Sequence, residues 1–232
     1  MINWNNFDSY IFDLDDTLIN TTQAVQSGWE YALNKHSFRN DLSQEKKINL
    51  LKKLIKFFGS SSDNEYWHAF IFELSKTSIR YPNPIATALC ETYRQGYWQE
   101  LKVSSQILSF LQFLSLKKKP LILVTNGCLS FQIKKLQHTG LSTYFENSVF
   151  CSSQYQPDHQ KPSPHMLIQV KMKYCVQKSI FIGNANSDII AGNLAGMDTV
   201  LISENTQEQD LKLMEPTYTL CWNEILMSMK DK

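Results

Sequence analysis

Short, mostly apolar runs alternate with longer segments of helical periodicity through much of the chain. Five runs stand out, at residues 10–12, 121–124, 148–151, 179–182 and 199–202. Each is shorter than an ordinary helix, and they are rich in the Ile, Val and Phe that strands favour. Because they do not alternate with polar residues, both faces of each strand are expected to be buried. Such strands are typical of a parallel sheet covered by helices on both sides, so the pattern predicts an α/β fold.

The segments between the later strands carry helix signals. Helices are predicted after a cap at Ser104 or Ser105 and onward to about residue 116, and at residues 130–138, 163–174 and 187–195. Gly140 and Gly196 follow two of these segments, where a left-handed C-terminal cap favours glycine. Pro164 is expected at the first helical position of a third segment, where its missing N–H group costs nothing. Strands and helices therefore alternate from residue 103 onward.

Residues 20–102 show helical periodicity only. The predicted helices run from Thr21 or Thr22 to residue 36, with Thr22 as a possible cap, and over residues 42–58, 64–76 and 84–98. No segment in this block resembles a strand. We therefore predict a core domain of residues 1–19 and 103–232, interrupted by an all-helical domain of residues 20–102 that acts as a lid.

Three predicted strands end in polar residues. Asp13 follows the first strand and begins a run that includes Asp15 and Asp16, whereas Thr125 and Gly183 follow two later strands. Ligands of parallel sheets bind beyond the carboxyl ends of the strands, so these positions are expected to share one crevice. Three carboxylates so close together repel one another, which favours a bound cation or a phosphate-binding pocket over a buried structural role.

The first acidic pair has the spacing that phosphoryl transfer needs. Asp13 can act as a nucleophile toward phosphorus, which divides one difficult step into two easier ones. Asp15 lies two residues further and can act as general acid for the leaving oxygen and then as general base for water. Asp16 receives no catalytic role.

Residues after the later strands supply the complementary groups. The hydroxyl of Thr125 and the backbone N–H groups of Asn126 and Gly127 can bind phosphate oxygens. Lys161 can bring a positive charge to the phosphoryl group, and a charge pair at 4 Å is worth about 4 kcal/mol at an effective dielectric constant of 20. Asp188 is an acid suited to Mg²⁺, bound directly or through water. Each signal alone has an ordinary explanation as a turn, a surface lysine or a helix-start charge, but their order along the chain favours a phosphate site.

Composition sets the broad class of the protein. The chain has 232 residues, 43% of them hydrophobic, and a formal net charge of +1 without a basic block. These values favour a packed core and favour neither a nucleic-acid partner nor a membrane surface. The five cysteines are widely spaced and odd in number, which predicts reduced, mostly buried thiols rather than disulfides or a zinc site. With no signal peptide and no apolar run of about 18 residues, the expected location is the cytoplasm.

The combined motifs resemble those of phosphatases in the haloacid dehalogenase superfamily. Asp13-x-Asp15-x-Thr17 is similar to the first motif of that family, and Thr125-Asn126-Gly127 is similar to the second. Lys161-Pro162 corresponds to the third motif, and Gly183-Asn184-x-x-x-Asp188 approximates the fourth. The similarity spans residues 7–19 and 103–203, and the position of the helical insertion resembles the α-helical C1 cap.

The resemblance carries specific expectations. It implies a Rossmann-like core, dependence on Mg²⁺ and phosphoryl transfer through a phosphoaspartate on Asp13. Asp15 separates the chain from the dehalogenase and phosphonatase branches, which lack an acid at that position. The implied metal ligands are the side chain of Asp13, the backbone carbonyl of Asp15, Asn184 and Asp188.

One position departs from the family pattern. The family usually has aspartate where this chain has Asn184, and that aspartate is a direct Mg²⁺ ligand. The amide oxygen of Asn184 can still coordinate a metal ion, but it brings no charge. We therefore expect weaker Mg²⁺ binding than is usual in the family, or low activity.

The leading hypothesis is an Mg²⁺-dependent phosphomonoesterase acting on a small phosphorylated metabolite, as a monomer or homodimer. A phosphoglycolate-like acid, a sugar phosphate and a nucleotide all remain open as substrates. One alternative is a phosphomutase of the same superfamily. Another is a low-activity homologue that binds phosphate esters and has a regulatory role, because of Asn184. The aromatic residues of the insertion are expected mostly to pack its helices, and Cys128 receives no role.

Overall fold

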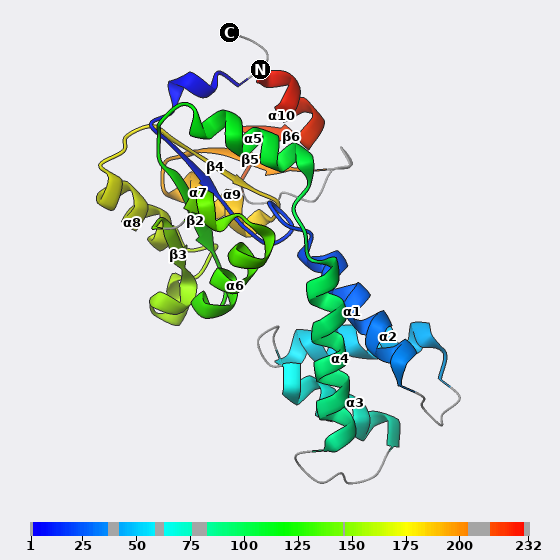
Figure 1. Ribbon diagram of the computed structural model, residues 1–232. Helices are drawn as coiled ribbons and strands as arrows, with labels where there is room; N and C mark the ends of the chain where they lie inside the picture. Colours follow the sequence, from blue (N-terminus) through cyan, green and yellow to red (C-terminus); the bar gives the residue numbers. More distant parts are fainter. Residues whose placement is uncertain are drawn as a thin grey trace. The chain divides into compact units, whose positions relative to one another are not determined.

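The computed structural model describes residues 2–36, 42–58, 63–75, 83–145, 147–203 and 214–229 (Figure 1). The chain divides into two compact units. One comprises Met1–Asn20 and Lys102–Lys232, and the other comprises Thr21–Leu101. We refer to them as the sheet unit and the helical unit.

The sheet unit is built on a six-stranded sheet with the strand order β3-β2-β1-β4-β5-β6. The strands are β1 (Ser9–Phe12), β2 (Leu121–Thr125), β3 (Val149–Cys151), β4 (Ser179–Gly183), β5 (Asp198–Ile202) and β6 (Tyr218–Leu220). Every neighbouring pair is parallel. The predicted Rossmann-like α/β fold, a parallel sheet flanked by helices, is confirmed. Strand β1 lies between β2 and β4, so the chain segments that follow these three strands emerge side by side.

Helices cover both faces of this sheet. They are α5 (Ser105–Ser115), α6 (Leu129–Thr139), α7 (Ser142–Phe145), α8 (His165–Tyr174), α9 (Asn186–Leu194) and α10 (Trp222–Ser228). Successive side chains of β1 point to opposite faces. Ile11 joins a buried cluster with Met166 of α8 on one face. Phe12 packs edge-on against Phe110 of α5 and Phe145 of α7 on the other. The apolar run at residues 10–12 of β1 is therefore explained by two separate cores.

Most predicted helix ends agree with the structure. The Ser104 side chain accepts a hydrogen bond from the N–H group of Ile107 at 3.3 Å, and so caps α5. Gly140 follows α6 with a φ of 73°, as a left-handed cap requires. The prediction for Pro164 was wrong by one position, because α8 begins at His165 and Pro164 precedes it. Helix α1 begins at Thr21, so Thr22 lies within its first turn instead of capping it.

The helical unit contains the four predicted helices. They are α1 (Thr21–Lys35), α2 (Gln44–Phe58), α3 (Asp63–Ser75) and α4 (Pro84–Glu100). The predicted end of the third helix at Lys76 lies outside the described residues. Gly28 of α1 and Gly96 of α4 allow these helices to pack closely. A Cβ atom built on Gly96 would lie only 3.0 Å from the Cα atom of Gly28, which leaves no room for a larger residue. Trp29, Tyr66 and Trp67 are buried, as expected for aromatic residues that pack a helical bundle.

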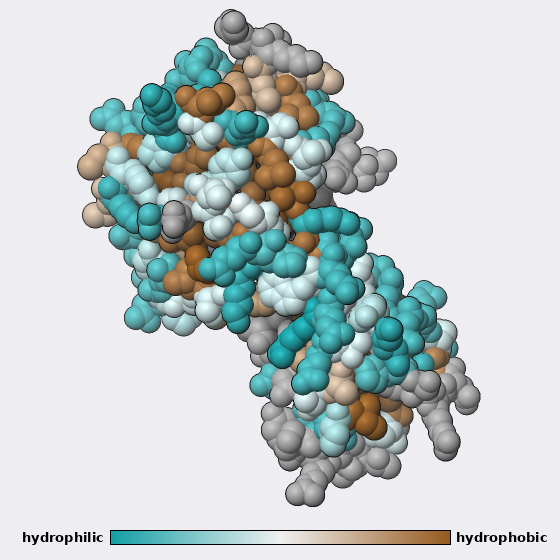
Figure 2. All heavy atoms as spheres, in the orientation of Figure 1, coloured by the Kyte–Doolittle hydropathy of each residue, from teal (hydrophilic) through white to brown (hydrophobic). Residues whose placement is uncertain are grey.

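Two further predictions concern the surface. Cys90 and Cys151 are buried, but Cys128 and Cys175 are exposed and Cys221 is intermediate, so the prediction of mostly buried thiols was wrong. Figure 2 shows hydrophilic residues over much of the displayed face with hydrophobic residues interspersed, as on ordinary protein surfaces. Among the described residues, no helix is both long and apolar enough to span a bilayer.

Candidate active site

The strand order brings the predicted site residues to one edge of the sheet. Asp13 directly follows β1, and its N–H group donates to the carbonyl oxygen of Ile182 in β4 at 2.9 Å. Thr125 is the last residue of β2, and Gly183 is the last residue of β4. Because β2, β1 and β4 are adjacent and parallel, these positions share the carboxyl edge, as the sequence predicts.

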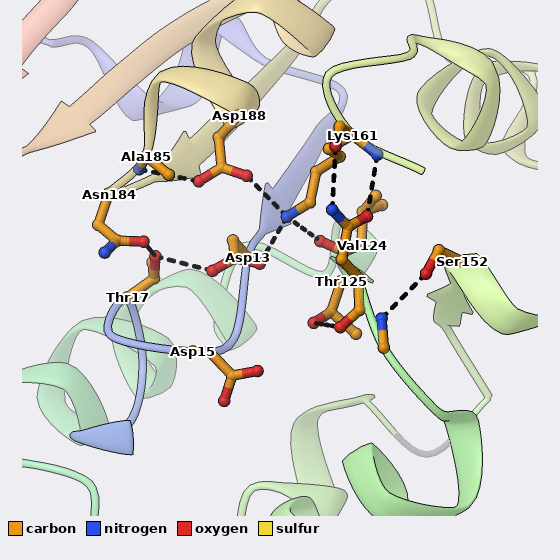
Figure 3. A network of polar contacts seen from close by, with 12 residues as sticks. Asp13, Asp15, Thr17, Val124, Thr125, Ser152, Lys161, Asn184, Ala185 and Asp188 are labelled. Atoms are coloured by element: carbon orange, nitrogen blue, oxygen red, sulfur yellow. Dashed lines mark hydrogen bonds and ion pairs between the residues drawn. The ribbon is translucent and has the colours of Figure 1, made fainter. Parts of the chain in front are cut away.

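Lys161 lies at the centre of a buried charge cluster (Figure 3). Its Nζ atom lies 2.5 Å from Oδ1 of Asp13 and 2.6 Å from Oδ1 of Asp188. It also donates to the carbonyl oxygen of Val124 at 3.1 Å. The side chain of Lys161 is only 3% exposed. One ammonium group therefore lies between two carboxyl groups and pairs with both.

The ionisation of this cluster reflects competition between burial and charge. Burial raises the pKa of Asp13 to about 7, whereas the positive charge of Lys161 opposes that rise and the charge of Asp188 adds to it. Burial alone lowers the pKa of Lys161, but the two carboxylates outweigh this effect and raise it. Lys161 is therefore a permanent cation at physiological pH.

Asn126 holds the segment that carries Lys161. Its Nδ2 atom donates to the carbonyl oxygen of Lys161 at 3.0 Å, and its Oδ1 atom accepts from the Lys161 N–H group at 2.9 Å. Sequence reasoning considered only the backbone N–H group of Asn126. The structure shows that its side chain joins the second and third motifs.

The turn after β2 is closed by residues that follow β3. Gly127 adopts a φ of 124°, a conformation that residues with a Cβ rarely adopt. Its N–H group donates to Oγ of Ser152 at 2.9 Å. The N–H group of Leu129 likewise donates to Oγ of Ser153, at 3.0 Å. The predicted phosphate donor at Gly127 therefore already has a protein partner, and a phosphate oxygen would have to replace the Ser152 hydroxyl there.

Asp15 is held by two residues of α6 that sequence reasoning missed. Nζ of Lys135 lies 2.6 Å from Oδ1 of Asp15, and Nε2 of Gln132 donates to Oδ2 at 2.9 Å. Lys135 and Gln132 are both buried. The available signal was their spacing of three residues on one predicted helix, on the face that also contains the buried Leu136.

The remaining residues of the acidic run have different surroundings. Asp16 is exposed with a φ of 58°, and its N–H group donates to the carbonyl oxygen of Ile19 at 2.8 Å. It is therefore a turn residue. Oγ1 of Thr17 lies 3.2 Å from Oδ2 of Asp13 and 3.0 Å from Oδ1 of Asn184. A single hydroxyl thus brings oxygens from the first and fourth motifs together.

These oxygens provide the test of whether a magnesium ion fits. Oδ2 of Asp13 and Oδ1 of Asn184 converge on one point, and hard oxygen donors are what Mg²⁺ prefers. Asp188 is engaged on both sides, because Oδ1 pairs with Lys161 and Oδ2 accepts the N–H group of Ala185 at 3.0 Å. Among the described residues no group of three or more His, Cys, Asp or Glu side chains forms a metal site. These oxygen donors are suited to a hard cation such as Mg²⁺, although few of them are charged.

Comparison with known proteins identifies the family. A model described as haloacid dehalogenase-like hydrolase matches residues 10–202. The chain is 27% identical, over 204 residues, to a glyceraldehyde 3-phosphate phosphatase from Methanothermobacter thermautotrophicus, and the match covers 86% of this chain and 87% of the relative. This chain belongs to the haloacid dehalogenase-like hydrolase family, and the predicted membership of that enzyme family is confirmed.

Two solved structures share the fold. One is a candidate β-phosphoglucomutase from Thermotoga maritima, with a TM-score of 0.73 and 18% identity, covering 96% of this chain and 98% of the other. The second is the candidate HAD-hydrolase YfnB from Bacillus subtilis bound to magnesium, with a TM-score of 0.67 and 20% identity, covering 97% of this chain and 99% of the other. At these identities the likeness establishes the fold.

Proposed function

We propose that this protein is an Mg²⁺-dependent phosphatase that hydrolyses a small phosphomonoester through an aspartyl-phosphate on Asp13. The observation that carries the proposal is the buried cluster of Asp13, Lys161 and Asp188 at the carboxyl ends of β1 and β4, beside Thr125 of β2. A carboxylate nucleophile, a fixed cation and a hydroxyl donor on one edge of a parallel sheet are suited to phosphoryl transfer.

The first step forms a bond between a carboxylate oxygen of Asp13 and phosphorus while the bond from phosphorus to the leaving oxygen breaks. Asp15 gives its proton to that oxygen, which leaves as an alcohol. Thr125 and Lys161 bind the non-bridging oxygens, whose negative charge Lys161 offsets. In the second step Asp15 takes a proton from water, the water oxygen bonds to phosphorus, and the Asp13 carboxylate is released with inorganic phosphate.

Asp13, the backbone carbonyl of Asp15 and Asn184 would hold the magnesium ion, with Asp188 acting directly or through water. When bound, Mg²⁺ neutralises charge on the transferred phosphoryl group. Because Lys161 occupies both buried carboxylates through one oxygen each, Oδ2 of Asp13 is left on the side of Thr17 and Asn184. The oxygen of Asp13 that attacks phosphorus and the oxygen that binds the metal ion would therefore be different atoms.

The substrate is proposed to be a small phosphorylated metabolite. Support comes from the relative named as a glyceraldehyde 3-phosphate phosphatase, which the chain matches over most of its length. Phosphoglycolate-type, sugar-phosphate and nucleotide substrates fit the same chemistry. We further propose that the helical unit is the cap domain that selects among them.

A panel of small phosphate esters tests this function. Purified protein is incubated with each ester and with added Mg²⁺, and released phosphate is measured beside the Asp13→Asn variant. We expect Mg²⁺-dependent release by the wild type and a loss of at least about a thousandfold in the variant, the scale seen when a covalent nucleophile is removed. Turnover that survives Asp13→Asn would overturn the assignment of the nucleophile.

A further inference from the structure

The carboxylate of Asp15 is gripped on both oxygens by α6. Lys135 pairs with Oδ1 at 2.6 Å, and Gln132 donates to Oδ2 at 2.9 Å. When each oxygen of a carboxylate has a fixed hydrogen-bond partner, the side-chain torsion angles are fixed as well. The orientation of Asp15 is therefore determined by residues 117 and 120 positions away in sequence.

The side-chain amide of Gln132 also links Asp15 to the turn that follows β2. Its Nε2 atom faces three oxygens: Oδ2 of Asp15, Oγ1 of Thr125 at 3.1 Å and the carbonyl oxygen of Asn126 at 2.8 Å. Rotating the amide would turn Oε1 toward a carboxylate and a carbonyl, so the orientation has one favourable form. Gln132 thus ties Asp15 to the phosphate-binding turn after β2.

Lys135 is unusually buried for a lysine on a helix at the surface of the sheet unit. Its side chain is 5% exposed, whereas the neighbouring Lys134 is exposed on the same helix. A lysine is buried only where a partner compensates for its lost hydration, and Asp15 is that partner. The chain therefore places a buried cation at a residue that is not in any of the four motifs.

The direction of Asp15 suits proton transfer to a leaving group. Figure 3 shows its carboxylate turned away from that of Asp13. In an in-line displacement the leaving oxygen departs from the face of phosphorus opposite the nucleophile. An acid for that oxygen must lie away from Asp13 and near the phosphate-binding residues, and the shared contact of Gln132 with Thr125 places Asp15 there.

We propose that Lys135, with Gln132, is a positioning residue that aligns Asp15 for proton transfer to the leaving oxygen. This inference rests on the proposed phosphatase function. Loss of Lys135 leaves nucleophile, metal ligands and Thr125 in place, but removes the ion pair that holds Oδ1 of Asp15. The effect falls on leaving groups that need a proton and spares those that do not.

The test compares two aryl phosphates of similar shape. p-Nitrophenolate departs without being protonated, whereas phenolate is a poorer leaving group that benefits from the acid. We expect Lys135→Met to lower kcat/KM for phenyl phosphate by about 10- to 100-fold, within the range that general acid catalysis and alignment contribute, and p-nitrophenyl phosphate by less than about threefold. The ratio kcat/KM reports the first irreversible step, so a slow second step does not mask the difference.

Matched variants separate alignment from folding. Lys134→Met removes a lysine from the exposed face of the same helix and should leave both substrates unaffected. Lys135→Arg keeps the charge and should restore most of the lost activity toward phenyl phosphate. In the Asp15→Asn background, Lys135→Met should cause no further leaving-group effect, because the two residues act as one unit. If Lys135→Met does not yield folded protein, Lys135→Gln, which keeps a donor group of smaller volume, replaces it.

Two outcomes would overturn the inference. One is an equal loss for both substrates, which is the behaviour of a structural lysine, and the other is no loss for either. The Asp13→Asn variant identifies a different failure. If it still hydrolyses both substrates, the proposed function fails and the role of Lys135 fails with it. If it is inactive but Lys135→Met does not discriminate, only the role of Lys135 fails.

Discussion

Asn126 and Lys161 are joined by two hydrogen bonds, one from the Asn126 side chain to the Lys161 carbonyl oxygen at 3.0 Å and one from the Lys161 N–H group to Oδ1 of Asn126 at 2.9 Å. Both the donor and the acceptor of the Asn126 side-chain amide are therefore bound to the backbone of Lys161. This fixes the segment before α8 against the turn after β2, and so fixes the backbone that carries the central cation of the site.

Replacing this amide should disturb the site without touching the nucleophile. Asn126→Ala removes both bonds, and we expect kcat/KM to fall by about 10- to 100-fold, because small misplacements of catalytic groups are costly. Two lost hydrogen bonds should lower the free energy of unfolding by about 1–3 kcal/mol. Steady-state kinetics and denaturant titration measure these effects. The exposed Asn147→Ala is the control, and an Asn126→Ala enzyme with unchanged kcat/KM would contradict the prediction.

Lys161 should be necessary for stability as well as activity. Lys161→Met leaves Asp13 and Asp188 buried side by side without their shared cation. Removing one partner of a buried ion pair costs about 3–5 kcal/mol, and we expect a loss of that order in the free energy of unfolding. Activity should fall by about 100- to 1,000-fold, since charge stabilisation of the phosphoryl group is lost. A variant as stable as the wild type would show that the cluster contributes no net stabilisation. The exposed Lys134→Met serves as the matched control.

Cys128 should be the more reactive of the two thiols near the phosphate-binding turn. A hydrogen bond with the Ser130 side chain, together with backbone N–H groups at the start of α6, lowers its pKa, and the residue is exposed. Burial raises the pKa of Cys151 instead. A lowered pKa means that the reactive thiolate persists to lower pH, so labelling of Cys128 by iodoacetamide should reach half its maximal rate at a lower pH than labelling of an ordinary cysteine.

Peptide mass spectrometry across a pH series measures that midpoint for each cysteine. Ser130→Ala should move the Cys128 midpoint upward, because it removes the leading stabilising contact of the thiolate. Labelling of Cys151 should remain slow throughout. Equal rates for Cys128 and Cys151 would contradict the prediction.

The fold could be predicted where local sequence and tertiary burial agree. Strand β1 is buried at every position because each face packs into a different core, and Gly140 marks the end of α6 because its φ of 73° suits glycine. Strand β6 and helix α10 were missed. Strand β6 has an exposed central residue, Thr219, and lacks an apolar run. Helix α10 is anchored from the far end of the chain, where Nε1 of Trp4 donates to Ser228 at 2.9 Å.

The site residues could likewise be predicted only where local sequence signals mark them. Asp13 directly follows β1, Thr125 ends β2, and Asp188 lies in the first turn of the helix that follows β4, so the strand order brings these three together. Lys161 lies between β3 and α8, and its motif made it recognisable in the sequence. Gln132 and Lys135 lie within a helix, where polar residues usually face water. Their burial depends on Asp15, which lies more than a hundred positions away, and no local pattern encodes that pairing.

Asn184 allows a direct test of how charge sets metal binding in this protein. Its Oδ1 atom accepts from the Thr17 hydroxyl at 3.0 Å, and the same hydroxyl lies 3.2 Å from Oδ2 of Asp13. Asn184→Asp would keep this geometry and add a negative charge beside the proposed cation. A charge pair near a protein surface is worth on the order of a few kcal/mol, partly offset by desolvation, so Mg²⁺ should half-saturate at a concentration about 10-fold or more lower.

Mg²⁺ titrations of hydrolysis and isothermal calorimetry measure the two proteins side by side. Asn147→Asp, a substitution of the same type at an exposed position before β3, is the control for a general effect of added charge, and it should leave the Mg²⁺ half-saturation within about twofold, because exposed charges away from the site are screened by solvent. If Asn184→Asp and the wild type show the same metal affinity and turnover, the amide is an equivalent ligand. The expectation that this chain binds magnesium weakly for its family would then be wrong.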